Sequence, residues 1–242
     1  MIRLAVFDLD GTLIDSQLDL CLAVNHALAT LGLPQRSLAE VASFVGEGAA
    51  LLVERAVAPR LELRDAALEA WWDHYEAHLL DHTVLYPGVR ELLDKLPFPL
   101  AVHTNKPGRL ARRILDGLGV GTRFVEVLGG DEAPRKPAPE GTRALLAHHR
   151  VMPEDAVLVG DSLIDLELAR AVPLRFVPVG WGLVAAERLA AASAGGGSRR
   201  TKPRRSRRRS CPRSVKTGGE PTGWRRCGPD SHRKSRRSSS SA

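Results

Sequence analysis

The chain has few cysteines and few aromatic residues, and it lacks any long hydrophobic run. Its three cysteines, Cys21, Cys211 and Cys227, are odd in number and form no close pair, so neither a disulfide framework nor a zinc cage is expected. No apolar stretch approaches the roughly 20 residues that a membrane helix needs. Asp8 and Asp10 interrupt the apolar stretch near the N-terminus. We therefore expect a cytoplasmic protein without a membrane span or a secretory signal.

Acidic residues are scarce at one end of the chain only. The 242 residues carry a net charge of +7, but residues 1–194 contain 19 Lys and Arg against 26 Asp and Glu. Residues 195–242 contain 16 against 2. The first part is therefore acidic, at −7, and the last 48 residues are basic, at +14. This asymmetry excludes a uniformly basic nucleic-acid-binding protein.

The basic segment 195–242 is rich in Arg, Lys, Ser, Gly and Pro and has almost nothing to bury. Such a composition cannot offset the entropy lost on ordering, so we predict a disordered tail. Three explanations stay open: binding of a nucleic acid or another polyanion, a passive extension, or an out-of-frame reading of a GC-rich gene end, which we favour. Nucleic acid is thus expected as a partner through this tail or not at all.

The first 194 residues alternate short apolar runs with amphipathic stretches. The runs predict strands at 2–7, 100–103, 124–128, 156–159 and 174–179. Helical periodicity lies between the last four, at 107–118, 139–150 and 162–171. Strands that alternate with helices imply a parallel sheet covered on both faces, which is an α/β, doubly wound, Rossmann-like core.

Residues 17–84 break this alternation, because they look helical throughout and contain no convincing strand. The expected helices are 18–31, 38–44, 49–57 and 64–80. We predict an inserted all-helical cap domain at 17–84 and a core made of residues 1–16 and 85–194.

Asp8 and Asp10 stand two residues apart where the first predicted strand ends, so both carboxylates point to the same side. Ligands of open α/β sheets bind at the carboxyl ends of the strands. Asp161 follows another predicted strand, and Asp165 would lie in the first turn of the next helix, where it could also form a capping box with Ser162. Clustered carboxylates call for a hard divalent cation, which indicates Mg²⁺.

Two further segments favour an anionic ligand. Thr104 lies in the segment HTNKP, residues 103–107, where a hydroxyl and the free amides of a helix start suit a phosphate. Lys136, in a proline-rich loop, could neutralise phosphate charge. Either feature alone is also typical of an ordinary helix cap or a solvated loop lysine.

In their order along the chain these segments resemble the haloacid dehalogenase superfamily of phosphohydrolases. The segments are DLDGTLIDS at residues 8–16, then TNK at 104–106, Lys136–Pro137, and GDSLID at 160–165. The resemblance covers about residues 2–193. Within the insert, FVGEGAALLVERA at residues 44–56 is similar to the cap loop of phosphoglycolate phosphatases. The basic tail stands where such proteins usually continue with a further strand and a helix.

The resemblance implies a magnesium-dependent phosphomonoester hydrolase that acts on a small phosphorylated metabolite, best matched by 2-phosphoglycolate. Asp8 would form an aspartyl-phosphate and Asp10 would serve as acid and base. The implied assignments are Mg²⁺ at Asp8, the Asp10 carbonyl, Asp161 and Asp165, phosphate at Thr12, Thr104, Asn105 and Lys136, and leaving-group selection at Gly46, Glu47 and Gly48. The alternatives are another small ester, a phosphomutase, or a polyanion-binding protein with an impaired catalytic domain. The oligomeric state is left open.

Other residues are expected to have no role in a site. His74, His78 and His82 recur at four-residue spacing, which we attribute to packing or a solvated helix face. The side chains of His148 and His149 are adjacent on a helix and are expected to point apart. Arg55 could support the Gly46–Gly48 loop or face solvent, and we favour solvent.

Overall fold

The computed structural model describes residues 1–183, 189 and 191. The predicted tail at 195–242 therefore lies outside the described residues. All described residues fall in one compact unit, so the proposed division into core and cap stays a prediction. None of the helices in this described part is long and apolar enough to cross a membrane.

A parallel five-stranded sheet forms the core, in the order β5-β4-β1-β6-β7. Its strands are β1 (Leu4–Phe7), β4 (Leu100–His103), β5 (Phe124–Leu128), β6 (Ala156–Gly160) and β7 (Arg175–Pro178). Every residue of β1 is buried, because the strand lies at the centre of the sheet and is covered on both faces. The predicted α/β, doubly wound fold is confirmed.

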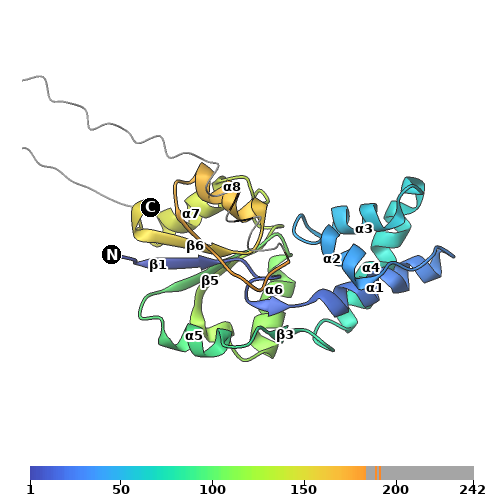
Figure 1. Cartoon of the computed structure of the whole chain (residues 1–242), viewed down its shortest axis with the longest axis horizontal. Helices are drawn as coiled ribbons and strands as arrows, with labels where there is room; N and C mark the ends of the chain where they lie inside the picture. The colour runs from blue at the N-terminus through green and yellow to red at the C-terminus, as the bar shows by residue number, and fades with distance from the viewer. Residues whose placement is uncertain (184–188, 190, 192–242) are drawn as a thin grey trace, which may run out of the picture. The chain divides into compact units, whose positions relative to one another are not determined.

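Helices cover both faces of this sheet (Figure 1). Those on one side are α5 (Val89–Lys95) and α6 (Gly108–Gly117), and those on the other are α7 (Glu140–His148) and α8 (Leu163–Ala171). Alternate residues of β1 belong to two separate cores: Ala5 and Phe7 pack with α6, whereas Leu4 and Val6 pack with α7 and α8. The strand thus anchors both layers.

The insert after β1 contains α1 (Gln17–Thr30), α2 (Leu38–Phe44), α3 (Ala49–Val57), a short 3₁₀ turn (Leu61–Leu63) and α4 (Arg64–Ala77). Helices α1 and α4 pack against each other and bury Val24, Leu28, Trp71 and Tyr75. The predicted helices are confirmed, although α4 ends earlier than residue 80.

Two short strands that the sequence did not indicate join the insert to the sheet domain. They are β2 (Ile14–Asp15) and β3 (Val84–Leu85), which pair antiparallel. The pairing places the entry and exit of the insert side by side, directly after the Asp8–Asp10 segment. Helix α5 was also missed in the sequence analysis.

Candidate active site

Three buried carboxylates meet at the carboxyl ends of β1 and β6. Asp8 follows β1, Asp161 follows β6, and Asp165 lies in the first turn of α8. Strands β1 and β6 are paired in parallel, with Phe7 opposite Val159, so both end at the same level. One oxygen from each of the three carboxylates lies within 4.8 Å of the others. Side chains more than 150 positions apart in sequence are thus brought together, as the strand-end argument predicted.

Backbone and hydroxyl donors hold the Asp161 carboxylate in place. The Thr12 hydroxyl donates to Oδ1 at 2.9 Å and the Leu183 amide donates to Oδ2 at 2.7 Å. Gly11 has a φ of +84°, and a Cβ there would lie 2.3 Å from Asp161 Oδ2. Glycine is therefore required at residue 11 both for the turn and for the space. The predicted phosphate contact of Thr12 stays a prediction.

Asp165 forms the helix cap that the sequence predicted, whereas its role as a metal ligand stays a prediction. The Asp165 amide donates to the Ser162 Oγ at 3.2 Å and the Ser162 amide donates to Asp165 Oδ2 at 3.2 Å, which completes a capping box. The Ser162 hydroxyl also donates to Oδ2 at 2.6 Å. The other carboxylate oxygen of Asp165, Oδ1, accepts from Lys136 Nζ at 2.7 Å. The helix cap thus fixes the orientation of a carboxylate in the buried group.

Lys136 bridges two of the three carboxylates, with Nζ 2.7 Å from Oδ1 of Asp8 and 2.7 Å from Oδ1 of Asp165. Its side chain is almost completely buried. Burial favours the neutral amine, but the charges of Asp165 and Asp8 outweigh it and raise the pKa of Lys136. The loop lysine is therefore part of a buried charge cluster.

The cluster has more negative than positive charge. Burial, followed by the charge of Asp165, raises the pKa of Asp8 well above its ordinary value. Burial also raises the pKa of Asp161 to about 6. The three carboxylates supply hard oxygen ligands, and one ammonium does not balance their charge. This combination suits Mg²⁺. The residues present therefore fit the cofactor that the sequence indicated.

Asp10 is not part of this carboxylate group, because its side chain points to a different set of partners. Its Oδ1 accepts from the Ser16 hydroxyl at 2.6 Å and from Lys106 Nζ at 2.7 Å. The charge of Asp10 raises the pKa of Lys106 against the opposing effect of burial. Sequence reasoning missed Lys106 as a site residue, although it directly follows Thr104 and Asn105 beyond a strand adjacent to β1.

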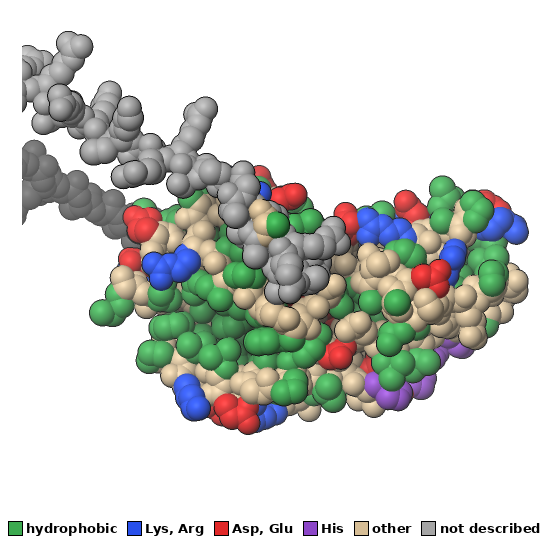
Figure 2. Space-filling view, viewed as in Figure 1, with side chains coloured by type: hydrophobic (Ala, Val, Ile, Leu, Met, Phe, Trp, Pro, Cys, Tyr) green, Lys and Arg blue, Asp and Glu red, His purple; other side chains and the backbone are tan. Residues whose placement is uncertain are grey.

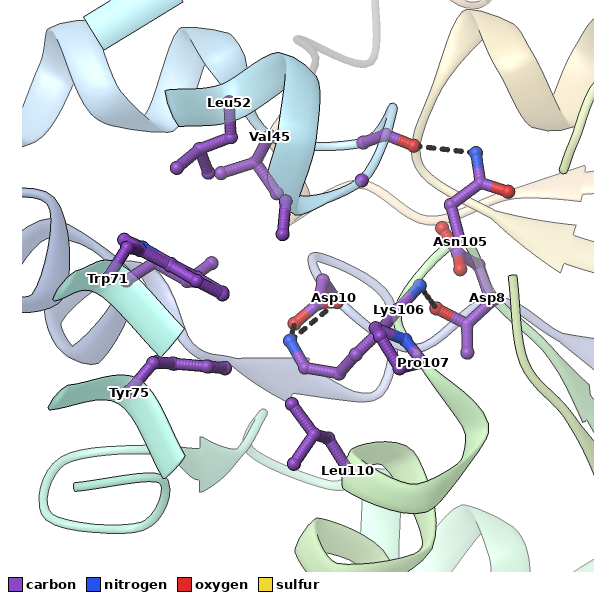
Figure 3. A pocket seen from close by; sticks show the side chains of 15 residues that line it. Asp8, Asp10, Val45, Leu52, Trp71, Tyr75, Asn105, Lys106, Pro107 and Leu110 are labelled. Atoms are coloured by element: carbon purple, nitrogen blue, oxygen red, sulfur yellow. Dashed lines mark hydrogen bonds and ion pairs between the residues drawn. The ribbon is translucent and has the colours of Figure 1, made fainter. Parts of the chain in front are cut away.

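A pocket opens above Asp8 and Asp10 (Figure 3). The sheet domain supplies its polar floor, and the insert supplies apolar walls that include Val45, Leu52 and Trp71. The Lys106 ammonium points toward Asp10 and lies 5.2 Å from the centre of the Tyr75 ring. Among the described residues that line the pocket, Lys106 carries the cationic side chain.

Asn105 connects the insert to the Lys136 loop. Its Nδ2 donates to the carbonyls of Gly46 at 2.9 Å and Lys136 at 3.0 Å, and its Oδ1 accepts from the Lys136 amide at 2.8 Å. These contacts position Lys136, whereas the predicted phosphate contact of Asn105 stays a prediction. The neighbouring Thr104 is buried and lines the pocket, as its prediction requires, but its ligand is likewise untested.

The Gly46–Gly48 loop lies against the sheet domain, where a Cβ on Gly48 would come within 3.4 Å of the Asn105 carbonyl oxygen. Arg55 pairs with Glu47 and donates to the Phe44 carbonyl at 3.3 Å. Our expectation that Arg55 faces solvent was wrong, because its side chain points toward the N-terminal end of α3 and so reaches the loop that precedes this helix. Arg55 and Asn105 thus hold the loop from two sides, and its role in selecting the leaving group stays a prediction.

His103, the last residue of β4, is a buried histidine beside the site. Its Nδ1 lies 2.8 Å from the Thr142 hydroxyl, and no described residue provides a hydrogen-bond partner for its Nε2. Burial, reinforced by the charge of Lys136, lowers the pKa of His103 to about 3. The imidazole is therefore neutral in the folded protein at any pH near neutrality.

This neutral imidazole makes stability depend on pH. Unfolding restores a pKa near 6.5, so the unfolded chain takes up a proton that the folded one excludes. The contribution of neutral His103 to the free energy of unfolding is complete above about pH 6.5 and is lost as the pH falls toward 3. At pH 5 the loss is about 2 kcal/mol. We expect His103→Asn, which keeps a polar partner for Thr142, to lose that much less stability between pH 7.5 and 5 in urea unfolding. Equal losses in the two proteins would contradict a neutral His103.

Comparison with known proteins gives the family. The model of the haloacid dehalogenase-like hydrolases matches residues 5–179. The chain belongs to the haloacid dehalogenase-like hydrolases. A phosphoglycolate phosphatase of Vibrio vulnificus is 39% identical over 183 residues, which are 70% of this chain and 79% of that protein. One of Pseudomonas putida is 40% identical over 192 residues, covering 74% and 70%.

Solved structures agree with this assignment. A crystal structure described as a predicted phosphoglycolate phosphatase from Haemophilus somnus has a TM-score of 0.72 and 34% identity, and the match covers 75% of this chain and 86% of that one. The haloacid dehalogenase-like fold therefore extends over the sheet, the insert and the carboxylate group, which confirms the family that the sequence motifs indicated.

Proposed function

We propose that this haloacid dehalogenase-like hydrolase is a magnesium-dependent phosphomonoester hydrolase acting on 2-phosphoglycolate. The observation that carries the proposal is the pocket in which Asp8 and Asp10 face the apolar wall of the insert, with Lys106 as its cationic side chain. Relatives named phosphoglycolate phosphatase at 39–40% identity support the substrate.

Asp8 is the proposed nucleophile. A carboxylate oxygen forms a bond to phosphorus as the bond from phosphorus to the ester oxygen breaks, which leaves an aspartyl-phosphate and an alkoxide. The Leu9 amide donates to Asp8 Oδ1 at 2.7 Å, and Lys136 holds the same oxygen. These contacts orient the other oxygen of Asp8, Oδ2, for the attack.

Asp10 is the proposed acid and base. Its carboxyl gives a proton to the departing alkoxide and then removes one from the water that hydrolyses the aspartyl-phosphate, which regenerates Asp8. Ser16 and Lys106 hold the Asp10 side chain at the pocket floor. The Asp10 carboxyl lines the same pocket as Asp8 but lies outside the buried carboxylate group, which supports a separate role for it.

Asp8, Asp161 and Asp165 would hold Mg²⁺, together with the Asp10 carbonyl that the family resemblance implies. When bound, the ion supplies compensation for the charge that develops on the phosphoryl oxygens. Lys136 adds a fixed positive charge beside Asp8, and Thr104 offers a hydroxyl to the phosphoryl group. The apolar walls of the insert exclude water from the reacting ester.

Lys106 is the residue that favours a carboxylated leaving group. Hydrolysis of 2-phosphoglycolate releases glycolate, whose carboxylate would otherwise be placed against apolar walls such as Leu52 and Trp71. A buried carboxylate needs a cationic or hydrogen-bonding partner. Lys106 Nζ is already directed into the pocket and has further donor capacity beside Asp10.

We expect 2-phosphoglycolate to give the highest kcat/KM in a panel that includes glycerol phosphate, a hexose phosphate and p-nitrophenyl phosphate, with turnover only when Mg²⁺ is present. In Lys106→Met the ratio of kcat/KM for 2-phosphoglycolate to that for glycerol phosphate should fall by about tenfold or more, which is about 1.4 kcal/mol. An equal fall in kcat/KM for both esters would be compatible with a phosphatase but would contradict the assignment of 2-phosphoglycolate as its substrate.

No observation within the described residues favours the alternatives. A phosphomutase would transfer the phosphoryl group to another hydroxyl of the same substrate. It would therefore release no phosphate from any ester of the panel. The polyanion-binding alternative depends on the tail at 195–242 and stays a prediction. Retention of the full chain on nucleic acid, without phosphate release from any ester, would favour it.

A further inference from the structure

Glu126, His148 and His149 form a second group of converging side chains, apart from the carboxylates described above. Within the described residues, two groups of at least three acidic, histidine or cysteine side chains have ligand atoms within 4.8 Å of one another. One is Asp8, Asp161 and Asp165, and the other is this group. It contains two imidazole nitrogens and one carboxylate oxygen, so its chemistry differs from that of the all-oxygen group.

Both histidines point to the same oxygen atom. His148 Nδ1 and His149 Nε2 each lie 2.8 Å from Oε2 of Glu126. Our expectation that the two side chains point apart was wrong. Helix α7 ends at His148, so both residues leave its last turn toward β5. Each also presents a different ring nitrogen, which compensates for the angular step between successive helical residues.

The chain around the two histidines is held in one conformation by the end of α7. Arg150 has a φ of 54°, its amide donates to the Ala147 carbonyl at 3.1 Å, and the Val151 amide donates to the Leu146 carbonyl at 2.9 Å. This is a Schellman motif, which fixes the direction in which the chain leaves the helix. The exposed carbonyl end of a helix also favours a bound cation.

The third ligand comes from a rigid part of the sheet. Glu126 lies in the middle of β5, the edge strand, and is opposite Ala101 of β4. Its side chain and that of His149 are mostly buried, at 25% and 21% exposed, whereas that of His148 is 73% exposed. The group is therefore preorganised on two sides and open to solvent on the third, which allows an ion to enter and water to complete its coordination.

We propose that Glu126, His148 and His149 bind a borderline transition-metal ion of the Zn²⁺ or Ni²⁺ class, which ties the end of α7 to the edge strand β5. Two imidazoles and a carboxylate are typical ligands of Zn²⁺, with bonds of about 2.0–2.2 Å. The donor atoms need to separate only slightly to surround one ion, because all three converge already. Mg²⁺ prefers sites made of oxygen only and does not compete here.

The test is a calorimetric titration of the full chain with Zn²⁺ in saturating Mg²⁺, which is added to fill the proposed magnesium site at Asp8. Glu126→Gln and His149→Gln should each weaken Zn²⁺ binding by more than about tenfold. The rise in melting temperature caused by Zn²⁺ should also shrink in both variants. Far-UV circular dichroism verifies that they fold.

A matched control comes from the insert, where Figure 2 shows histidine side chains gathered on the surface. There His26, His74 and His78 stack with ring centroids 4.4 Å apart, but their nitrogens do not converge as a group within 4.8 Å. His78→Gln should leave Zn²⁺ affinity unchanged. No binding by the parent, or equal affinity in the parent and both site variants, would overturn the proposal. Neither result bears on phosphatase activity.

Discussion

Replacing Asp8 by asparagine is expected to lower magnesium-dependent phosphate release by about 10⁴-fold or more, because the amide cannot form the bond to phosphorus. The substitution keeps the size of the side chain and keeps an oxygen available to Lys136 and the Leu9 amide. The measurement is single-turnover release of phosphate from 2-phosphoglycolate. If that ester proves not to be the substrate, p-nitrophenyl phosphate serves the same purpose.

The same variant separates loss of chemistry from loss of fold. Asp8 is one of three converging buried carboxylates, so Asn removes a negative charge that Asp161 and Asp165 oppose. Without Mg²⁺, urea unfolding of Asp8→Asn should therefore give a free energy no lower than that of the parent. Asp73→Asn, an exposed carboxylate on α4, is the matched control and should keep full activity. Parent-level turnover by Asp8→Asn would refute the nucleophile.

The parts of the fold that were predictable depend on local patterns. Strand β1 is a continuous apolar run that ends in Asp8, and the strand–helix alternation allows one parallel arrangement in which strand ends share an edge. Those two facts were enough to place Asp8, Asp161 and Asp165 together. The capping box at Ser162 was also readable, since its residue spacing is fixed by helix geometry.

The parts that were missed depend on contacts between distant segments. The β2–β3 pair has two residues in each strand, which is too short for any periodic signal. The pairing of Lys106 with Asp10 joins residues 96 positions apart and needs the two strand ends to be neighbours. The shared partner of His148 and His149 could not be predicted for the same reason, because Glu126 lies on β5 and helix geometry alone does not show which strand faces the end of α7.

Replacing Lys136 by methionine is expected to destabilise the protein by about 3–5 kcal/mol without Mg²⁺, because it leaves the buried carboxylates of Asp8 and Asp165 without their ammonium partner. Activity should also fall by about 10²–10³-fold, the usual cost of removing one fixed group that stabilises transition-state charge. Urea unfolding and kcat/KM measure the two effects separately. Lys95→Met, at an exposed lysine on α5, controls for loss of a positive charge.

A second substitution distinguishes charge compensation from simple packing at Lys136. If the loss of stability comes from uncompensated carboxylates, Asp165→Asn added to Lys136→Met should restore part of it, because the double variant removes one of the opposed negative charges. If Lys136 matters only through the volume of its buried side chain, the second change adds its own cost, since Asp165 Oδ2 also accepts from the Ser162 hydroxyl in the helix cap.

Added Mg²⁺ should stabilise Lys136→Met more than the parent, because the cation then compensates a cluster of three carboxylates that has lost its ammonium. Equal stabilisation of both proteins by Mg²⁺ would contradict a shared electrostatic site.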